Sequence, residues 1–94
     1  MNVVWTPSAL RDRRAIREFI GLYSPQAAIE FEEYIAKHVE LLKAHPGLGR
    51  SGAYTGTREL VVHRHYLVVY RVADNLIRVL RVKHTSLRWP RVRS

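Results

Sequence analysis

The stretch RELVVHRHYLVVYRVADNLIRVLRVK, residues 58–83, decides the fold. Two tight turns are expected within it, at Arg64–His65 and at Asp74–Asn75. The three runs that these turns separate are rich in valine, leucine, isoleucine and tyrosine, which favour strands. These runs are Arg58–His63, Tyr66–Ala73, and a third from Leu76 or Ile77 to Lys83. The stretch therefore predicts three consecutive antiparallel strands.

The register of the second hairpin determines which side chains share a face. A two-residue turn would set Arg71 opposite Arg78, and directly opposed like charges are unfavourable. A three-residue turn that includes Leu76 sets Arg71 opposite Val79 instead, and a shift of one residue turns a whole strand over. We expect the three-residue turn. It would put Val68, Tyr70, Val72, Leu80 and Val82 against the helices, and would leave an open face made of Leu67, Val69, Arg71, Val79, Arg81 and Lys83.

Two helices are predicted before these strands. Thr6–Pro7 and Ser24–Pro25 each place a capping side chain ahead of a proline, which is a common start of a helix. We expect the first helix to end near Gly21 and the second to run from Pro25 to about Ala44. Apolar residues repeat at helical spacing in both: Ile16, Phe19, Ile20 and Tyr23 in the first, and Ala28, Phe31, Ile35, Val39 and Leu42 in the second. The short join between them predicts an antiparallel helical hairpin.

The remaining segments complete a single α+β domain over residues 1–94. Asn2–Trp5 is predicted to be an edge strand that adds to the sheet, and residues 45–57 are predicted to be a loop. The expected order is β-α-α-β-β-β, an antiparallel sheet with the helical hairpin packed on one face. A chain of 94 residues leaves no room for a second domain.

Composition narrows the classes of function. The absence of cysteine excludes disulfide scaffolds and thiol catalysis. No apolar run approaches the roughly 18 residues of a membrane span, so we expect a cytoplasmic protein with no membrane partner. The net charge of +8 lies in the second half: residues 1–47 hold six basic and six acidic residues, whereas residues 48–94 hold ten and two. Arginine outnumbers lysine, 13 to 3, which favours an anionic partner because arginine binds carboxylates and phosphates bidentately.

One cluster could carry chemistry. Arg81, Lys83, His84 and Arg88 lie at or just after the end of the last strand. A histidine among cations can act as a general acid or base on RNA while arginines stabilise the phosphate charge, or the cluster can simply bind an anion. His63 and His65 flank a turn and are expected to be solvent-exposed and to bind no metal. No nucleotide-binding glycine loop is present, and no cofactor is expected.

Several segments in order resemble the RelE/ParE superfamily of toxins from bacterial type II toxin–antitoxin modules. Trp5-Thr6-Pro7-Ser8-Ala9 resembles the opening of the family sequences. Ser24-Pro25-Gln26-Ala27-Ala28 resembles the start of the family's second helix. The post-helix turn and the strand signature correspond to Pro46, Gly49-Arg50, Gly56-Thr57-Arg58-Glu59-Leu60, Tyr66 and Val69-Tyr70-Arg71-Val72. The closing pattern corresponds to Val82-Lys83-His84 with Arg88-Trp89-Pro90. The resemblance covers nearly the whole chain and implies the same order of elements.

Two activities compete within that superfamily. RelE-like members cut messenger RNA in the ribosomal A site, whereas ParE-like members poison DNA gyrase and are not nucleases. For RelE-like members, the resemblance implies an arginine directly after the tyrosine that opens the middle strand, where this chain has Leu67. It also implies a tyrosine or a lysine–arginine pair near the C-terminal end, where this chain has His84-Thr85-Ser86-Leu87 and no tyrosine after Tyr70. A histidine at about the place of His84 occurs in some RNA-cutting relatives.

We therefore expect a toxin that poisons DNA gyrase, is not itself an enzyme and is neutralised by a cognate antitoxin. Its antitoxin or target would bind the predicted open face. The alternative is a ribosome-dependent endoribonuclease acting on messenger RNA, in which His84, Arg81 and Arg88 would be the catalytic candidates. A third possibility is a basic binding module without toxicity, because one scaffold can serve several functions.

Overall fold

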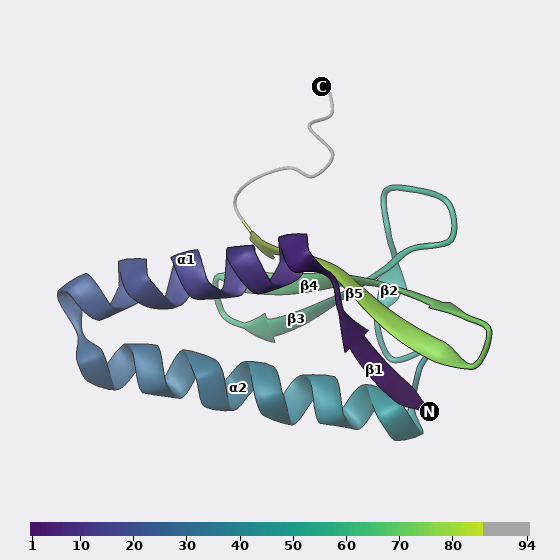
Figure 1. Ribbon diagram of the computed structural model, residues 1–94, viewed down its shortest axis with the longest axis horizontal. Coiled ribbons are helices and arrows are strands. Elements are labelled where there is room, and N and C mark those ends of the chain that lie inside the picture. Colours follow the sequence, from purple (N-terminus) through teal and green to yellow (C-terminus); the bar gives the residue numbers. More distant parts are fainter. Residues whose placement is uncertain (86–94) are drawn as a thin grey trace.

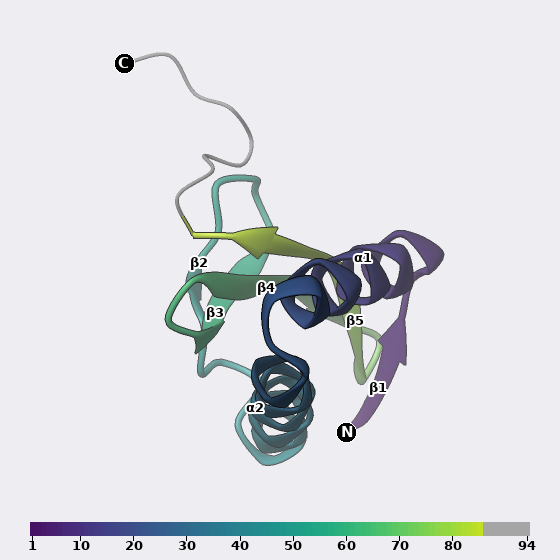
Figure 2. The ribbon, with the colours of Figure 1, turned by 90° about the vertical axis from the view of Figure 1, so that its left-hand side faces the viewer.

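The computed structural model describes residues 1–85 as two helices packed against one face of a five-stranded sheet (Figures 1 and 2). The helices are α1 (Pro7–Tyr23) and α2 (Pro25–Ala44). The strands are β1 (Asn2–Trp5), β2 (Arg50–Ser51), β3 (Arg58–His63), β4 (Tyr66–Ala73) and β5 (Leu76–His84). Their order in the sheet is β1-β5-β4-β3-β2. The predicted α+β fold is confirmed, and Arg88, Trp89 and Pro90 lie outside the described residues.

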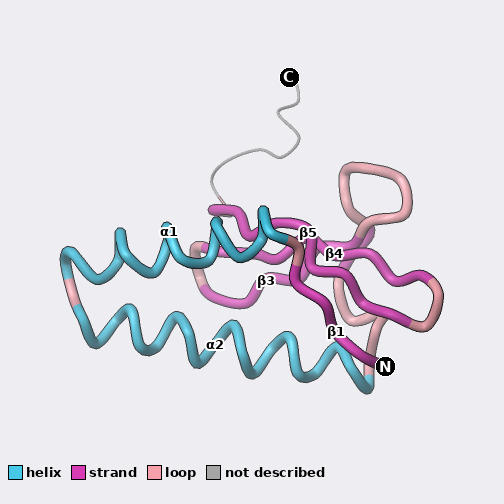
Figure 3. The backbone as a smooth tube through the Cα atoms, in the orientation of Figure 1, coloured by secondary structure: helices cyan, strands magenta, loops and turns pink. Residues whose placement is uncertain are grey.

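We predicted an antiparallel sheet, but the sheet is mixed. β1 pairs in parallel with β5, from Asn2 opposite Leu76 to Trp5 opposite Val79. The two helices form the connection that returns the chain to the sheet before the antiparallel meander begins (Figure 3). A second difference is the two-residue strand β2, which pairs with β3 inside the stretch predicted to be a loop.

The helices begin where the sequence predicts. Thr6 and Ser24 each accept a hydrogen bond at the side-chain oxygen from the backbone N–H three residues on, at 3.1 Å in both cases. α1 continues past Gly21 to Tyr23, contrary to the expected end. A Cβ at Gly21 would lie 3.8 Å from the Cβ of Ala28, an ordinary van der Waals contact, so this glycine faces α2.

The core lies between the helices and the inner face of the sheet. The predicted stripe of α2 is confirmed, because Ala28, Phe31, Ile35, Val39 and Leu42 are its buried residues. Val68, Tyr70 and Val82 belong to the same cluster, also as predicted. The predictions for Val72 and Leu80 were wrong: Val72 is 36% exposed, Leu80 is only half-buried, and Ile77 and Val79 take the core positions of β5.

The register of the second hairpin explains these differences. Asp74 and Asn75 have φ angles of 54° and 59°, so they form a two-residue turn of the type that favours tight hairpins, and the three-residue turn that we predicted is wrong. The turn sets Arg71 opposite Arg78 and Tyr70 opposite Val79. The next pair is Val69 with Arg81, so Leu80 is an extra residue in a β-bulge. The bulge restores Val82 to the core face, and Val79 lies there as well.

Candidate functional site

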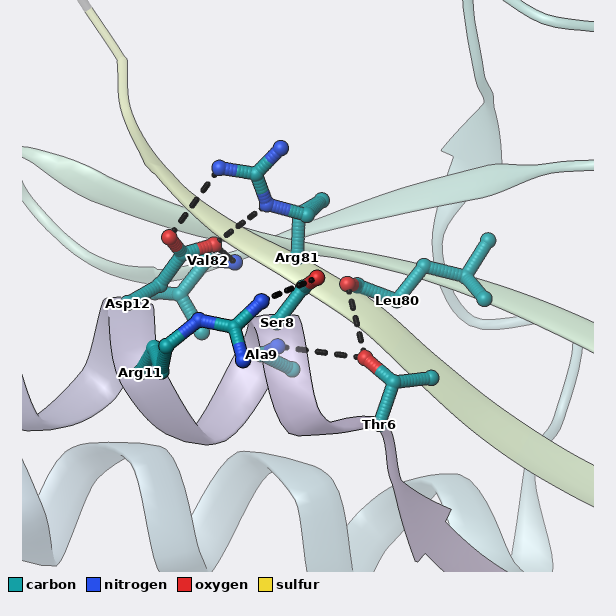
Figure 4. Close-up of polar contacts among 8 residues, drawn as sticks. All are labelled: Thr6, Ser8, Ala9, Arg11, Asp12, Leu80, Arg81 and Val82. Carbon is teal, nitrogen blue, oxygen red and sulfur yellow. Dashed lines mark hydrogen bonds and ion pairs between the residues drawn. The ribbon is translucent and has the colours of Figure 1, made fainter.

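Asp12 joins α1 to the end of β5 (Figure 4). Arg81 donates two hydrogen bonds to its carboxylate, from Nε to Oδ2 at 2.7 Å and from Nη2 to Oδ1 at 3.1 Å. The backbone N–H of Val82 donates to Oδ2 at 2.9 Å. This bidentate ion pair is the strong form of an arginine–carboxylate contact, and it links residues 69 apart in the sequence.

The contact between the start of α1 and the end of β5, which we call the seam, covers the edge of β5 beyond the last residue of β1. The backbone N–H of Thr6 donates to the carbonyl oxygen of Val79 at 3.0 Å, and its hydroxyl donates to the carbonyl oxygen of Leu80 at 3.0 Å. Asp12 then takes the N–H of Val82. Thr6 and the first turns of α1 therefore satisfy backbone groups of β5 that lie beyond the end of β1.

Charge and burial act against each other on this seam. Partial burial disfavours ionised Asp12, but the hydrogen bonds from Arg81 and Val82 and the charges of Arg81 and Lys83 outweigh it and lower the pKa of Asp12 below its usual value. The hydrogen bond to Asp12 raises the pKa of Arg81. Burial, followed by the charge of Arg81, lowers the pKa of Lys83. The ion pair is therefore fully charged at neutral pH.

A cleft of about 310 Å³ opens beside the seam. It is lined by Asp12, Ala15, Ile16, Phe19, Tyr66, Val82, Lys83 and His84. The ring of His84 stacks on that of His65 with centroids 5.6 Å apart, and meets the edge of Tyr66 at 5.1 Å. Burial raises the pKa of Tyr66. Phe19, predicted to face the core, is 55% exposed at the side of this cleft because α1 presents its Ile16 and Ile20 to the core instead.

The predicted open face is not open as the sequence suggested. Leu67 is 7% exposed, and Val69 and Val79 are fully buried. Val79 changes face because of the two-residue turn, and Arg81 is held by Asp12. Arg71 remains exposed and Lys83 is half-buried. Of the catalytic candidates, the structure brings Arg81 and His84 to the same end of β5, and Arg88 lies outside the described residues.

His63 also differs from the prediction. Its ring packs edge-on against Tyr34, with centroids 5.4 Å apart, and its buried Nδ1 has no hydrogen-bond partner among residues 1–85. Burial, with the nearby charges of His65 and Arg64, lowers the pKa of His63. His65, by contrast, is exposed as expected. Within residues 1–85, no group of three histidine or acidic side chains lies close enough to hold a metal ion.

We did not predict from the sequence that Asp12, Tyr66 and His65 lie together at the end of β5. No sequence pattern indicates the partner of Asp12, because Arg81 lies 69 residues away. Tyr66 and His84 are opposite each other in the ladder of β4 and β5. The alternation of side chains along β4, together with this pairing, could have predicted that they are neighbours. Among the described residues, no helix is long and apolar enough to cross a membrane.

Comparisons with known proteins agree with this geometry. The family model described as ParE toxin of type II toxin–antitoxin system, parDE, matches residues 3–89. Toxin RelE2 of Caulobacter vibrioides is 40% identical over 85 residues, which are 90% of this chain and 96% of that protein. The putative toxin Y4kP of Sinorhizobium fredii is 35% identical over 92 residues, 97% of this chain and 95% of that one.

A solved structure extends the likeness to three dimensions. The chromosomal ParDE toxin–antitoxin system from P. aeruginosa contains a chain with a TM-score of 0.77 and 30% identity, covering 89% of this chain and 95% of that one. The match of the family model over nearly the whole sequence, the identity of the relatives and the shared two-helix, mixed-sheet fold lead to one conclusion. The chain belongs to the ParE toxin family of type II toxin–antitoxin systems, within the RelE/ParE superfamily.

Proposed function

We propose that this toxin inhibits growth by poisoning DNA gyrase and that a cognate antitoxin neutralises it. The observation that carries the choice of gyrase is the engagement of Arg81. A ribonuclease of this type would need a cation beside His84 to stabilise the charge on the phosphate in the transition state. Arg81 instead donates both of its hydrogen bonds to Asp12, and its charge is compensated there.

A second observation supports the same choice. Leu67 follows Tyr66 at the place where the family resemblance implies an arginine in ribosome-dependent nucleases. Leu67 is apolar and only 7% exposed, so it offers no cation to a bound RNA. An inhibitor that acts by binding gyrase needs no proton donor and no such arginine. The described lining of the cleft holds one lysine, Lys83, and no arginine.

An antitoxin partner is supported by similar structures. The P. aeruginosa relative is a ParDE system, and the fold neighbours include a YoeB–YefM complex from Staphylococcus aureus. For this chain we keep Arg71 as a binding residue because it is exposed. Leu67, Val69 and Val79 are buried and cannot provide the apolar contact that the sequence suggested, whereas exposed Phe19 beside the cleft can.

The alternative, a messenger RNA endoribonuclease, is favoured by one observation. His84, His65 and Tyr66 have their rings in contact at one side of the cleft, with Lys83 also in its lining. Histidine and tyrosine side chains can both move protons during RNA cleavage. In this reading Lys83 would have to supply the charge that Arg81 cannot.

Two assays on the purified protein separate the mechanisms. We expect it to inhibit plasmid supercoiling by gyrase and to leave translated messenger RNA uncut in primer extension. His84→Ala should then retain the inhibition of gyrase, and removal of exposed arginines should weaken it gradually and in a salt-dependent way.

A nuclease would behave differently. His84→Ala would remove a general acid–base contribution, about 10²–10⁴-fold in rate. His84→Phe, which keeps a ring against His65 and Tyr66 but cannot move a proton, is the matched control for loss of packing. Ribosome-dependent cuts by the wild type that disappear in His84→Ala would overturn the proposal, as would normal supercoiling at toxin concentrations that arrest growth.

A further inference from the structure

The tip of the β4–β5 hairpin carries two arginines in an unfavourable arrangement. Arg71 and Arg78 are directly opposite each other in the antiparallel ladder, so their side chains leave the same face of the sheet. Both residues are exposed. The hairpin reaches beyond the end of β3, whose first residue, Arg58, is opposite Tyr70 (Figure 1).

The other arginines of the sheet have internal partners. Arg50 is paired with Glu59 at 3.2 Å, Arg58 donates to the carbonyl oxygen of Gly49 at 2.8 Å, and Arg81 is paired with Asp12. Within residues 1–85, the side chains of Arg71 and Arg78 make no ion pair or hydrogen bond. Asp74, the acidic residue of the adjoining turn, forms no ion pair with either guanidinium.

The neighbouring loop approaches one side of Arg71. Gly56 occupies a turn in which Thr57 N–H donates to the carbonyl oxygen of Tyr54 at 3.1 Å, and its φ of +82° is one that glycine adopts without strain. A Cβ at Gly56 would lie 3.6 Å from Nε of Arg71. That separation is an ordinary van der Waals distance, so Gly56 lies directly beside the guanidinium of Arg71.

We propose that Arg71 and Arg78 form a clamp for two carboxylates of an extended acidic segment of the antitoxin. This inference rests on the proposed antitoxin partner. In an extended chain, side chains on one face repeat about every 6.6–6.8 Å. The Cα atoms of a hydrogen-bonded cross-strand pair are about 5.5 Å apart, so acidic residues at positions i and i+2 match the two arginines. Each guanidinium can bind one carboxylate bidentately.

An acidic polypeptide fits this surface better than duplex DNA does. Specific or non-specific DNA binding draws on many phosphate contacts, typically six to ten for a strong salt dependence. Here the uncompensated cations at the hairpin tip are only Arg71 and Arg78 among the described residues, and Arg64 lies in the turn at the far end of β4. Two carboxylates would neutralise the pair completely.

The test uses the full chain, an alternating Glu-Val octapeptide and its Gln-Val counterpart. The Nε–H signals of Arg71 and Arg78 should shift in an NMR titration with the Glu-Val peptide and stay in place with the Gln-Val peptide. Arg78→Thr should weaken affinity about tenfold or more, and Arg71→Lys/Arg78→Lys should weaken it although the net charge is kept. Arg64→Thr is the control, with an equal loss of charge at the other hairpin.

Stability gives a readout independent of binding. Because Arg78→Thr removes a like-charge pair, its Tm at low salt should rise by about 1–5 °C, whereas Arg64→Thr should not raise it. Equal peptide affinity for Arg78→Thr and the wild type would overturn the clamp, and so would tighter binding of a 20-base-pair duplex that shifts the same two signals. A clamp that fails while the chain still inhibits gyrase leaves the proposed function standing.

Discussion

Replacing Asp12 by alanine should destabilise the domain substantially. The change leaves the N–H of Val82 without its acceptor, which costs about 1–3 kcal/mol when the group is shielded from water. It also breaks the ion pair with Arg81, whose side chain is 34% exposed against 18% for Asp12. Solvent screening limits that second contribution to about 1 kcal/mol. The expected loss is about 2–4 kcal/mol in the free energy of unfolding.

The assay is thermal unfolding followed by circular dichroism. For a domain of this size, about 1 kcal/mol corresponds to roughly 4–8 °C in Tm, so Asp12→Ala should melt about 8–30 °C below the wild type. Asp12→Asn keeps an oxygen that can accept from Val82 and should lose only about 1 kcal/mol. Glu18→Ala, an exposed acidic residue of the same helix with no hydrogen bond or ion pair in the described part of the chain, is the control.

The pH dependence has a definite sign. The pKa of Asp12 is lower in the folded than in the unfolded chain, so its contribution is fully present above the unfolded value of about 4 and is lost as pH falls through the folded value. The difference in Tm between the wild type and Asp12→Asn should therefore shrink as pH falls from 6 to below 4. A loss in Asp12→Ala no larger than in Glu18→Ala, or a difference from Asp12→Asn that ignores pH, would refute the reasoning.

Three further predictions concern the core and the loop beneath it. Phe31→Ala should cost about 3–5 kcal/mol, because Phe31 is fully buried, and a soluble variant with an unchanged Tm would contradict the packing. Gly49→Ala should destabilise the fold, because the added Cβ would lie 2.8 Å from the carbonyl oxygen of Glu59 and from the hydroxyl of Tyr70. Denaturant midpoints measure the loss of stability. Gly47→Ala is the control, because a Cβ there would meet nothing within 4 Å. His63, whose pKa is lowered in the fold, should titrate by NMR below its usual 6.5 and contribute a loss of stability as pH falls through that value, a loss absent from His63→Gln.

The elements could be predicted from the sequence because each has a strong local signal. The two cap-and-proline starts and the apolar stripe of α2 are periodic features that depend on few distant contacts. The ends of β3 and β4 follow from turn residues, and both strands have the predicted bounds. The parallel pairing of β1 could not be predicted, because the sequence of a four-residue strand does not indicate which strand it pairs with.

The register was mispredicted because two local preferences conflict. Opposed arginines cost only about 0.2–1 kcal/mol, whereas an Asp-Asn pair with both φ angles positive matches the twist of a hairpin closely. The turn therefore decides the register, and the bulge at Leu80 corrects the face further along the strand. A bulge leaves little trace in a run such as Val79-Leu80-Arg81-Val82, where either of two residues can be the extra one.

The contacts of the arginines in the fold change which positive charges a partner can bind. The excess of arginine in the second half indicates an anionic partner, but composition counts every cation as available. Arg50, Arg58 and Arg81 are held by carboxylate or carbonyl oxygens of the fold itself. Among the described residues of the second half, the exposed arginines without such a partner are Arg64, in the β3–β4 turn, and the opposed pair Arg71 and Arg78 at the β4–β5 tip. Electrostatic recognition on this scaffold consequently depends on the register that a two-residue turn imposes.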